Sequence, residues 1–219
     1  MKIVPTGIEN FKELIDKDAC YVDKTNLIEK VLKEKVVLYT RPRRFGKTLN
    51  MSMLYYFFSN KEKENAYLFD GLNISKNKEA LKHQNQYPVI FISLKDMKES
   101  KIENQLVKFS YIIARLLDQF EDILDDDIFN EREKKLLKRY HLNTASKNEL
   151  SESLLTISLC LRKYYHQKVI ILIDEYDVPL QAAYQHNYYD EMVEFLRNVF
   201  SSSLKTNDAL EKGIMTGCL

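Results

Sequence analysis

The residues best suited to chemistry stand in one basic string that contains a glycine. Arg41-Pro42-Arg43-Arg44-Phe45-Gly46-Lys47-Thr48 follows an apolar run at 36–39 and precedes an apolar segment at 49–58. A strand, a tight loop with Gly-Lys-Thr and then a helix form the context of a phosphate-binding loop, or Walker A motif. In such a loop, backbone N–H groups and the N-terminal end of the helix bind phosphate oxygens.

The residue types of this string suit a nucleotide with its divalent cation. We expect Lys47 to reach the β- and γ-phosphates as a catalytic residue, and the Thr48 hydroxyl to bind Mg²⁺. Gly46 allows the backbone to approach a phosphate closely. The usual G-x-x-x-x-G-K-[ST] pattern has a further glycine where this chain has Arg41, so the string needs a second signal. The expected nucleotide-binding residues are Arg43, Arg44, Phe45, Gly46, Lys47, Thr48 and Leu49.

The second signal is an apolar run that ends in carboxylates, as a Walker B motif does. Residues 169–173 are five consecutive β-favouring apolar residues, and Asp174-Glu175-Tyr176-Asp177 follows them. Such a run predicts a strand that is buried on both faces, and ligands bind at the carboxyl ends of strands in open parallel sheets. We expect Asp174 to hold Mg²⁺ and Glu175 to act as the base that activates water. The alternative is a buried strand that ends in a solvated acidic turn.

The adjacent Asp-Glu pair favours hydrolysis over transfer to a small molecule, because a hydrolase must activate water. It therefore favours the ATPase branch, in which a strand is inserted between the Walker A and Walker B strands. The predicted fold class is α/β: a three-layer P-loop NTPase with a mainly parallel sheet.

Four apolar runs predict the strands that position these residues, and helical patterns separate them. The runs lie at 36–40, 88–94, 168–174 and 212–219. Strands that alternate with helices form right-handed crossovers and a parallel sheet. We expect a helical segment at 1–34 to pack on a core domain at 35–219.

The intervening helices are predicted from apolar spacing and from one capping signal. Helical spacing covers 102–120, and two further helices are expected near 179–186 and 190–204. Ser146 and Glu149 form a capping box that predicts the start of a long helix with a buried stripe through Tyr164.

Composition limits the classes of partner. The chain has 219 residues, of which 45% are hydrophobic, and a net charge of +1. This balance gives no global attraction to nucleic acid, so any such affinity must come from a local patch. The three cysteines show no C-x-x-C pairing, which favours a cytoplasmic location. No run reaches the ~18 apolar residues of a membrane span, so we expect no membrane partner.

The two strings together resemble the AAA-ATPase-like family of bacterial P-loop proteins. The segments Gly7-Ile8, Tyr21-Val22-Asp23-Lys24-Thr25 and Met215-Thr216-Gly217 extend the resemblance over almost the whole chain. It implies ATP as the nucleotide, and a switch or motor that serves another domain, a protein partner or a homo-oligomer. It places Thr216 near the attacking water. Family members usually continue past this strand and often end in a nuclease-like domain, so we expect the domain to be truncated at its C-terminus.

Four alternatives are weighed against ATP hydrolysis. The chain could bind ATP without turnover, or contact nucleic acid through the Arg41–Arg44 cluster, although the near-zero net charge disfavours direct contact. Some of these arginines could instead form structural ion pairs, for example with Asp177. A Glu133-x-Lys135 pattern also resembles part of a nuclease site, but a solvated helix face explains it better.

Overall fold

Four parallel strands form the central sheet of the computed structural model, which describes residues 4–42 and 44–218. Each run that was predicted as a strand is one, with ends shifted by up to two residues. The strands are β1 (Val36–Thr40), β2 (Val89–Ser93), β3 (Val169–Asp174) and β4 (Leu210–Gly217).

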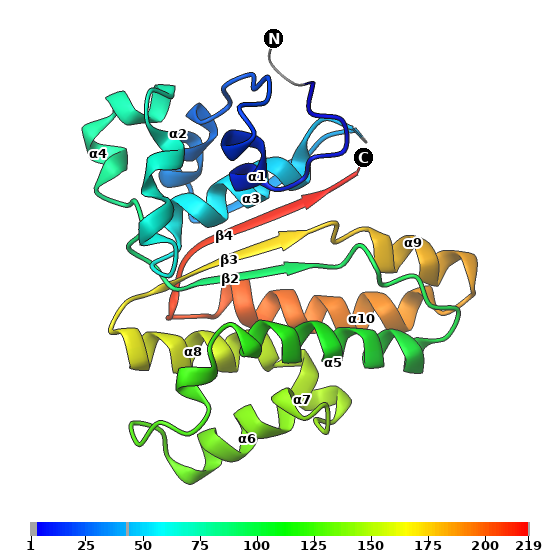
Figure 1. Ribbon diagram of the computed structural model, residues 1–219. Helices are drawn as coiled ribbons and strands as arrows, with labels where there is room; N and C mark the ends of the chain where they lie inside the picture. Colours follow the sequence, from blue (N-terminus) through cyan, green and yellow to red (C-terminus); the bar gives the residue numbers. More distant parts are fainter. Residues whose placement is uncertain (1–3, 43, 219) are drawn as a thin grey trace.

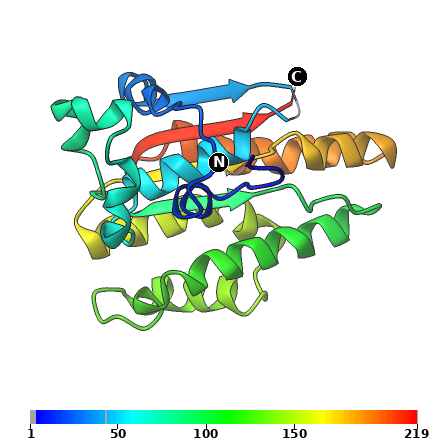
Figure 2. The ribbon, with the colours of Figure 1, turned by 45° about the horizontal axis from the view of Figure 1, so that its top comes forward.

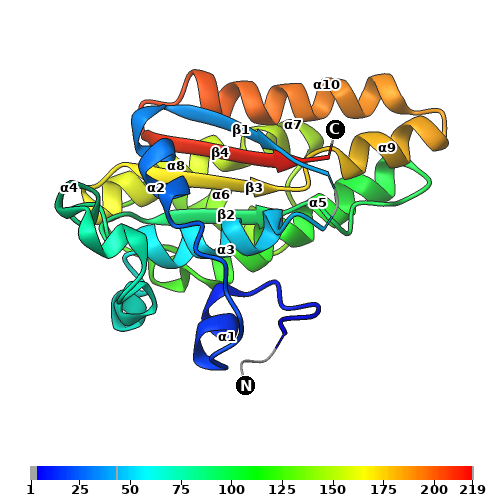
Figure 3. The ribbon, with the colours of Figure 1, turned by 90° about the horizontal axis from the view of Figure 1, so that it is seen from above.

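The strand order is β1-β4-β3-β2, and every neighbouring pair is parallel. All the strands therefore end at one edge of the sheet, which Figure 3 shows from above. In register, Thr40 of β1 is beside Gly217 of β4, and Ser93 of β2 is beside Asp174 of β3. Because β4 lies between β1 and β3, it separates the strand before the basic string from the strand before the acidic one.

Helices cover both faces of the sheet, so the molecule has three layers (Figure 1). In a second view the blue and cyan N-terminal helices lie in front of the sheet, and the green helices lie below it (Figure 2). On the first face lie α1 (Phe11–Asp16), α2 (Asn26–Lys33), α3 (Lys47–Phe58) and α4 (Lys78–Leu81), with 3₁₀ helices η1 (Lys63–Phe69) and η2 (Asn73–Lys76). On the second lie α5 (Ile102–Asp118), α8 (Ser153–Tyr165) and α10 (Tyr189–Phe200).

The remaining helices lie outside these layers. The second face carries an additional cover of α6 (Glu131–His141) and α7 (Lys147–Ser151), after a 3₁₀ turn at Glu121–Ile123. Helix α9 (Val178–Gln185) follows β3 at the carboxyl edge of the sheet, and α10 continues into a π-helical turn at Ser201–Lys205. No helix in the described ranges is long and apolar enough to cross a membrane.

Strand β3 is the centre of both cores, because all six of its residues are buried. Its side chains alternate between the faces. Ile170 and Leu172 belong to the core under α1–α3, whereas Val169, Ile171 and Ile173 belong to the core under α5, α8 and α10. A strand packed on both faces has little freedom to move, so the residues at its carboxyl end are held rigidly.

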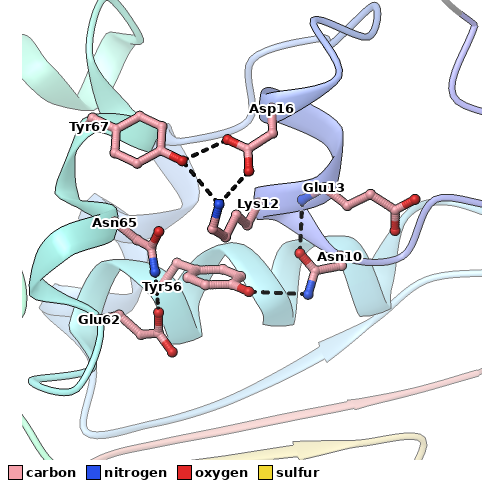
Figure 4. A network of polar contacts seen from close by, with 8 residues as sticks. All are labelled: Asn10, Lys12, Glu13, Asp16, Tyr56, Glu62, Asn65 and Tyr67. Atoms are coloured by element: carbon pink, nitrogen blue, oxygen red, sulfur yellow. Dashed lines mark hydrogen bonds and ion pairs between the residues drawn. The ribbon is translucent and has the colours of Figure 1, made fainter.

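Polar contacts fasten the N-terminal helix α1 to the first face (Figure 4). The Tyr67 hydroxyl donates to Asp16 at 2.7 Å, and Lys12 donates to both the Tyr67 oxygen and Asp16. Asn10 caps α1 through the backbone of Glu13 and donates to the Tyr56 hydroxyl of α3 at 3.2 Å. The segment is thus held against the helix that begins at the basic string, and a domain boundary at residue 34 stays a prediction.

The long helix predicted from the capping box is wrong in one respect. The Ser146–Glu149 box forms as expected, but it begins the short helix α7. The backbone leaves helical geometry at Glu152, and α8 begins at the next residue. The hydroxyls of Ser151 and Ser153 donate to carbonyls three residues earlier, and such bonds compete with continuous helix.

Candidate functional site

One cavity joins the basic and acidic strings at the carboxyl edge of the sheet. Its volume is about 740 Å³, and it lies between the start of α3, the turn from β3 to α9, and the N-terminal segment. Arg44, Gly46, Lys47, Thr48 and Leu49 line it from the basic string. Glu175 and Asp177 line it from the acidic one. Two patterns that are far apart in the sequence therefore face a shared space.

The loop between β1 and α3 turns sharply with two residues in left-handed backbone geometry. Arg44 has φ 69°, and Gly46 has φ 72° and immediately precedes α3. The Gly46 carbonyl accepts the first helical hydrogen bond from Asn50 at 3.0 Å. The first N–H groups of a helix have no intrahelical acceptors, so the N-terminal end of α3 offers donors and a positive dipole beside the cavity.

Among the described residues of the basic string, Arg41, Pro42 and Phe45 do not line the cavity. Phe45 is 57% exposed, and Arg43 lies outside the described residues. The Arg41 guanidinium lies over the Tyr39 ring, 5.4 Å from its centroid. Within the described ranges, no ion pair joins Arg41 or Arg44 to Asp177. The Asp177 carboxylate instead accepts hydrogen bonds from the backbone of Cys218 at 3.0 Å and from Gln181 at 2.6 Å.

Lys47 is buried, with an exposed fraction of 6%. Its ammonium donates to the Arg41 carbonyl at 2.9 Å, the Pro42 carbonyl at 3.2 Å and the Cys218 thiol at 3.1 Å. An ammonium has three N–H donors, so these contacts use all of them. Contact between Lys47 and a phosphate would therefore require at least one of these bonds to be exchanged.

Asp174 is fully buried, and its two oxygens differ. Oδ1 accepts a hydrogen bond from the Thr216 hydroxyl of β4, while Oδ2 is buried without a hydrogen-bond partner. A buried carboxylate oxygen is costly unless a donor or a cation faces it. Mg²⁺ prefers oxygen ligands and retains several waters, so the donor atoms of Asp174 and Thr48 suit the ion, although only Thr48 of the two lines the cavity. In the described part of the chain, no cluster of three His, Cys, Asp or Glu residues could hold a metal, at this site or at another.

Glu175 occupies a strained position directly after β3. Its φ is 56°, which is rare for a residue with a side chain. Burial raises the pKa of its carboxyl above the usual value, and the charges of Asp174 and Asp177 raise it further, whereas Lys47 and Lys98 oppose the shift. Strain and a raised pKa at one cavity residue are features of functional carboxylates.

Strand β4 packs directly against the acidic turn that follows β3. The backbone of Tyr176 donates to the Thr216 carbonyl at 3.1 Å. A Cβ at Gly217 would lie 2.5 Å from the Tyr176 ring and 2.7 Å from the Asp177 carboxylate. Only glycine allows the acidic turn to pack this closely against β4.

Sequence reasoning missed several residues that line the cavity. Lys98 comes from the loop after β2, Gln181 and Gln185 come from α9, and Cys218 follows β4. Gly7 and Ile8 also line it, and they belong to a segment that contributed to the family resemblance. A polar residue one turn into the helix after the acidic string is a usable signal for Gln181, whereas nothing local marks Lys98.

A parallel α/β sheet whose first strand leads through a Gly-Lys-Thr loop into a helix defines a P-loop-like protein. The chain belongs to the AAA-ATPase-like family, because the model of that family, described as "Predicted AAA-ATPase", matches residues 5–219. The comparisons with curated proteins and with solved structures gave no match.

Proposed function

We propose that this protein binds Mg-ATP in the 740 Å³ cavity and hydrolyses it. The observation that carries the proposal is the meeting of Lys47, Thr48 and Glu175 around one cavity at the carboxyl edge of a parallel sheet. This edge is where α/β proteins bind ligands. Membership of a family described as a predicted AAA-ATPase supports ATP as the nucleotide.

Each residue has a role that its position supports. The backbone between Arg43 and Leu49 holds the phosphates beside the N-terminal end of α3. Lys47 leaves its carbonyl partners and contacts the β- and γ-phosphates. Thr48 and Asp174 hold Mg²⁺, which supplies charge neutralisation at the phosphate oxygens when it is bound. Glu175 accepts the proton of the attacking water, a role that requires its ionised form.

The sheet order supports an ATPase rather than a kinase. Strand β4 lies between β1 and β3, and it presents Thr216 beside Asp174. An inserted strand between the Walker A and Walker B strands is the arrangement expected of the ATPase branch. Through this hydrogen bond between Thr216 and Asp174, a change at the bound nucleotide can alter the position of β4. We therefore propose a switch or motor that acts on another domain or partner.

Calorimetry with ATP, ADP and GTP, each with and without Mg²⁺, tests the binding step. We expect Mg²⁺ to strengthen ATP binding, and ATP to bind more tightly than GTP. Steady-state phosphate release from the same preparation tests turnover. Absence of ATP binding at millimolar concentration would overturn the whole proposal.

The three bonds of the Lys47 ammonium also favour a second candidate, an ATP-binding module without turnover. In that case ATP would bind with Mg²⁺ dependence, but phosphate release would stay at the rate of a Glu175→Gln variant. Measuring both quantities on one sample separates the two functions.

A further inference from the structure

A second cavity lies beside the first, and its wall is strongly basic. It has a volume of about 490 Å³ and lies between α5 and the loop that follows β2, at an outer edge of the sheet. We call it the α5 groove. Its charged residues are Lys95, Lys98, Lys108 and Arg115, with Asp96 as the one carboxylate among the described lining residues. Because the net charge of the chain is near zero, an anionic partner would have to bind to a local basic patch such as this one.

The ion pairs within the α5 groove are weak enough to leave its cations available to a ligand. Lys95 faces Glu9 at 3.7 Å and Lys108 faces Glu99 at 3.8 Å, and both pairs are solvent-exposed. Exposed ion pairs at such distances contribute little, so a phosphate could replace either carboxylate. Arg115 makes no ion pair with any described residue.

An aromatic ring stands among these charges. Tyr111 is 49% exposed and lines the groove, with Lys108 three residues before it and Arg115 four residues after it on α5. Residues at this spacing share one face of a helix. Basic groups on either side of an exposed ring suit a nucleic-acid strand, whose phosphates pair with cations while a base stacks on the ring.

The loop that forms the opposite wall is held by buried hydrogen bonds. Gln105 is fully buried and donates to the Met97 carbonyl at 3.1 Å and to the Tyr188 hydroxyl at 3.0 Å. The Tyr188 hydroxyl in turn donates to the Glu99 carbonyl. These contacts anchor the loop on both sides of Lys98, so the groove keeps its shape without a ligand.

We propose that the α5 groove binds single-stranded nucleic acid, with Lys95, Lys108 and Arg115 on the phosphates and Tyr111 against a base. The carboxylates of an acidic polypeptide would satisfy the cations, but these side chains offer no flat ring for the exposed face of Tyr111. The site is separate from Arg44, which lines the nucleotide cavity, and from Arg41, which lies over the Tyr39 ring.

Lys98 lines both the groove and the nucleotide cavity. If ATP binds as proposed above, this shared cation connects the two sites, because the nucleic-acid strand and ATP would compete for its charge. Linkage is reciprocal, so each ligand should weaken the binding of the other by the same factor. Binding of the strand without nucleotide does not depend on this connection.

Fluorescence anisotropy with labelled 12-nucleotide oligo-dT and oligo-rU, in the absence of nucleotide, tests the groove. We expect the logarithm of the affinity to fall with the logarithm of salt with a slope of about −2 to −3, from three or four phosphate contacts. The Lys108→Glu/Arg115→Glu variant should flatten this slope by about 1 or more and weaken binding at least tenfold. Tyr111→Ala should weaken binding by about 5- to 150-fold at an unchanged slope, while Tyr111→Phe retains it.

The matched control is Arg132→Glu/Lys135→Glu, an equal reversal of charge on the exposed side of α6. It should bind both oligonucleotides as the wild type does, and calorimetry with ATP should give the same affinity for both double variants. The proposal is overturned by absence of binding at low salt, or by equal effects of the two double variants. It is also overturned if a 12-residue glutamate peptide binds as tightly and Tyr111→Ala has no effect, which would assign the groove to an acidic polypeptide.

Discussion

The two segments that meet in the nucleotide cavity are held in different ways. The acidic string ends β3, a strand with all residues buried, and its Asp174 is bonded to the neighbouring strand β4. The basic string follows β1, an outer strand of the sheet on which Val36 and Leu38 are 43% and 57% exposed. Packing thus fixes the acidic half, whereas loop geometry and a few hydrogen bonds hold the basic half.

Because of this difference, substitutions in the two halves should affect the free energy of unfolding and the affinity for ATP to different extents. A substitution in the acidic half should change unfolding as well as ligand binding, because its side chains are part of the packed interior. A substitution in the basic half should change ligand binding with a smaller effect on unfolding. The predictions below test that separation.

The largest expected effect is on turnover in Glu175→Gln. The substitution removes the base and keeps the shape, so turnover should fall by about 10²- to 10⁴-fold while ATP affinity stays near wild type. Steady-state phosphate release and calorimetry measure the two quantities. Turnover at the wild-type rate would show that Glu175 is not the base.

The pH profile of the wild type sharpens the same prediction. A base acts when deprotonated, and the raised pKa of Glu175 moves its deprotonation above the usual pH of about 4.5. Turnover should therefore fall as the pH is lowered through this raised pKa. The same shift means that the folded protein disfavours the ionised form of Glu175. The protonated carboxyl therefore contributes in full to the free energy of unfolding below the pKa of the unfolded chain. This contribution is lost as the pH rises through the raised pKa of the folded protein.

In the basic half, Lys47→Ala should weaken ATP binding by about 10- to 150-fold, because charge-assisted hydrogen bonds to phosphate contribute about 1.5–3 kcal/mol. Calorimetry at fixed Mg²⁺ measures it. The control is Lys35→Ala, an exposed lysine directly before β1, at the opposite end of that strand. Equal ATP affinity in the two variants would remove Lys47 from the nucleotide site.

In the acidic half, Asp174→Asn should raise the Mg²⁺ concentration needed for half-maximal ATP binding by about 10- to 100-fold. The variant should nevertheless be more stable than the wild type without ligand, because loss of a buried charge outweighs the cost of a buried amide N–H group that has no acceptor. Calorimetry over a Mg²⁺ series and urea unfolding measure both. A marked loss of stability would show that the charge of Asp174 serves the fold rather than the metal.

Much of this architecture was predictable from the sequence, because apolar runs and helical spacing report burial directly. The strand at 36–40 was predicted with its observed ends, and the buried run at 169–173 placed Asp174 and Glu175 at a strand end. The contribution of Lys98 was not predictable, because it depends on where the loop after β2 lies in space. The bonds of Lys47 to its own loop depend on φ values that residue types alone do not specify.

Thr216→Val tests how firmly β4 holds the acidic half. The substitution preserves shape but leaves Asp174 Oδ1 without its donor, so the free energy of unfolding should fall by about 1–3 kcal/mol. Urea unfolding measures it. Thr206→Val is the control, because that hydroxyl is exposed and makes a single bond of 3.4 Å, and its change should stay within about 0.5 kcal/mol.

The smallest expected effect is that of replacing Gly46 by alanine, which tests whether this glycine serves the backbone geometry alone or also ATP binding. Gly46 and Gly71 have nearly equal φ values of 72° and 74°, and an added Cβ at either position meets no atom closer than 3.6 Å. Replacing either glycine by alanine should therefore lower the free energy of unfolding by a similar amount, about 1–2 kcal/mol, since left-handed geometry disfavours a side chain. Of these two glycines, only Gly46 lines the nucleotide cavity, so Gly46→Ala should weaken ATP binding and Gly71→Ala should not. Equal ATP affinities in the two variants would show that the loop around Gly46 tolerates a Cβ beside the phosphates, and would leave the basic half dependent on Lys47 and Thr48.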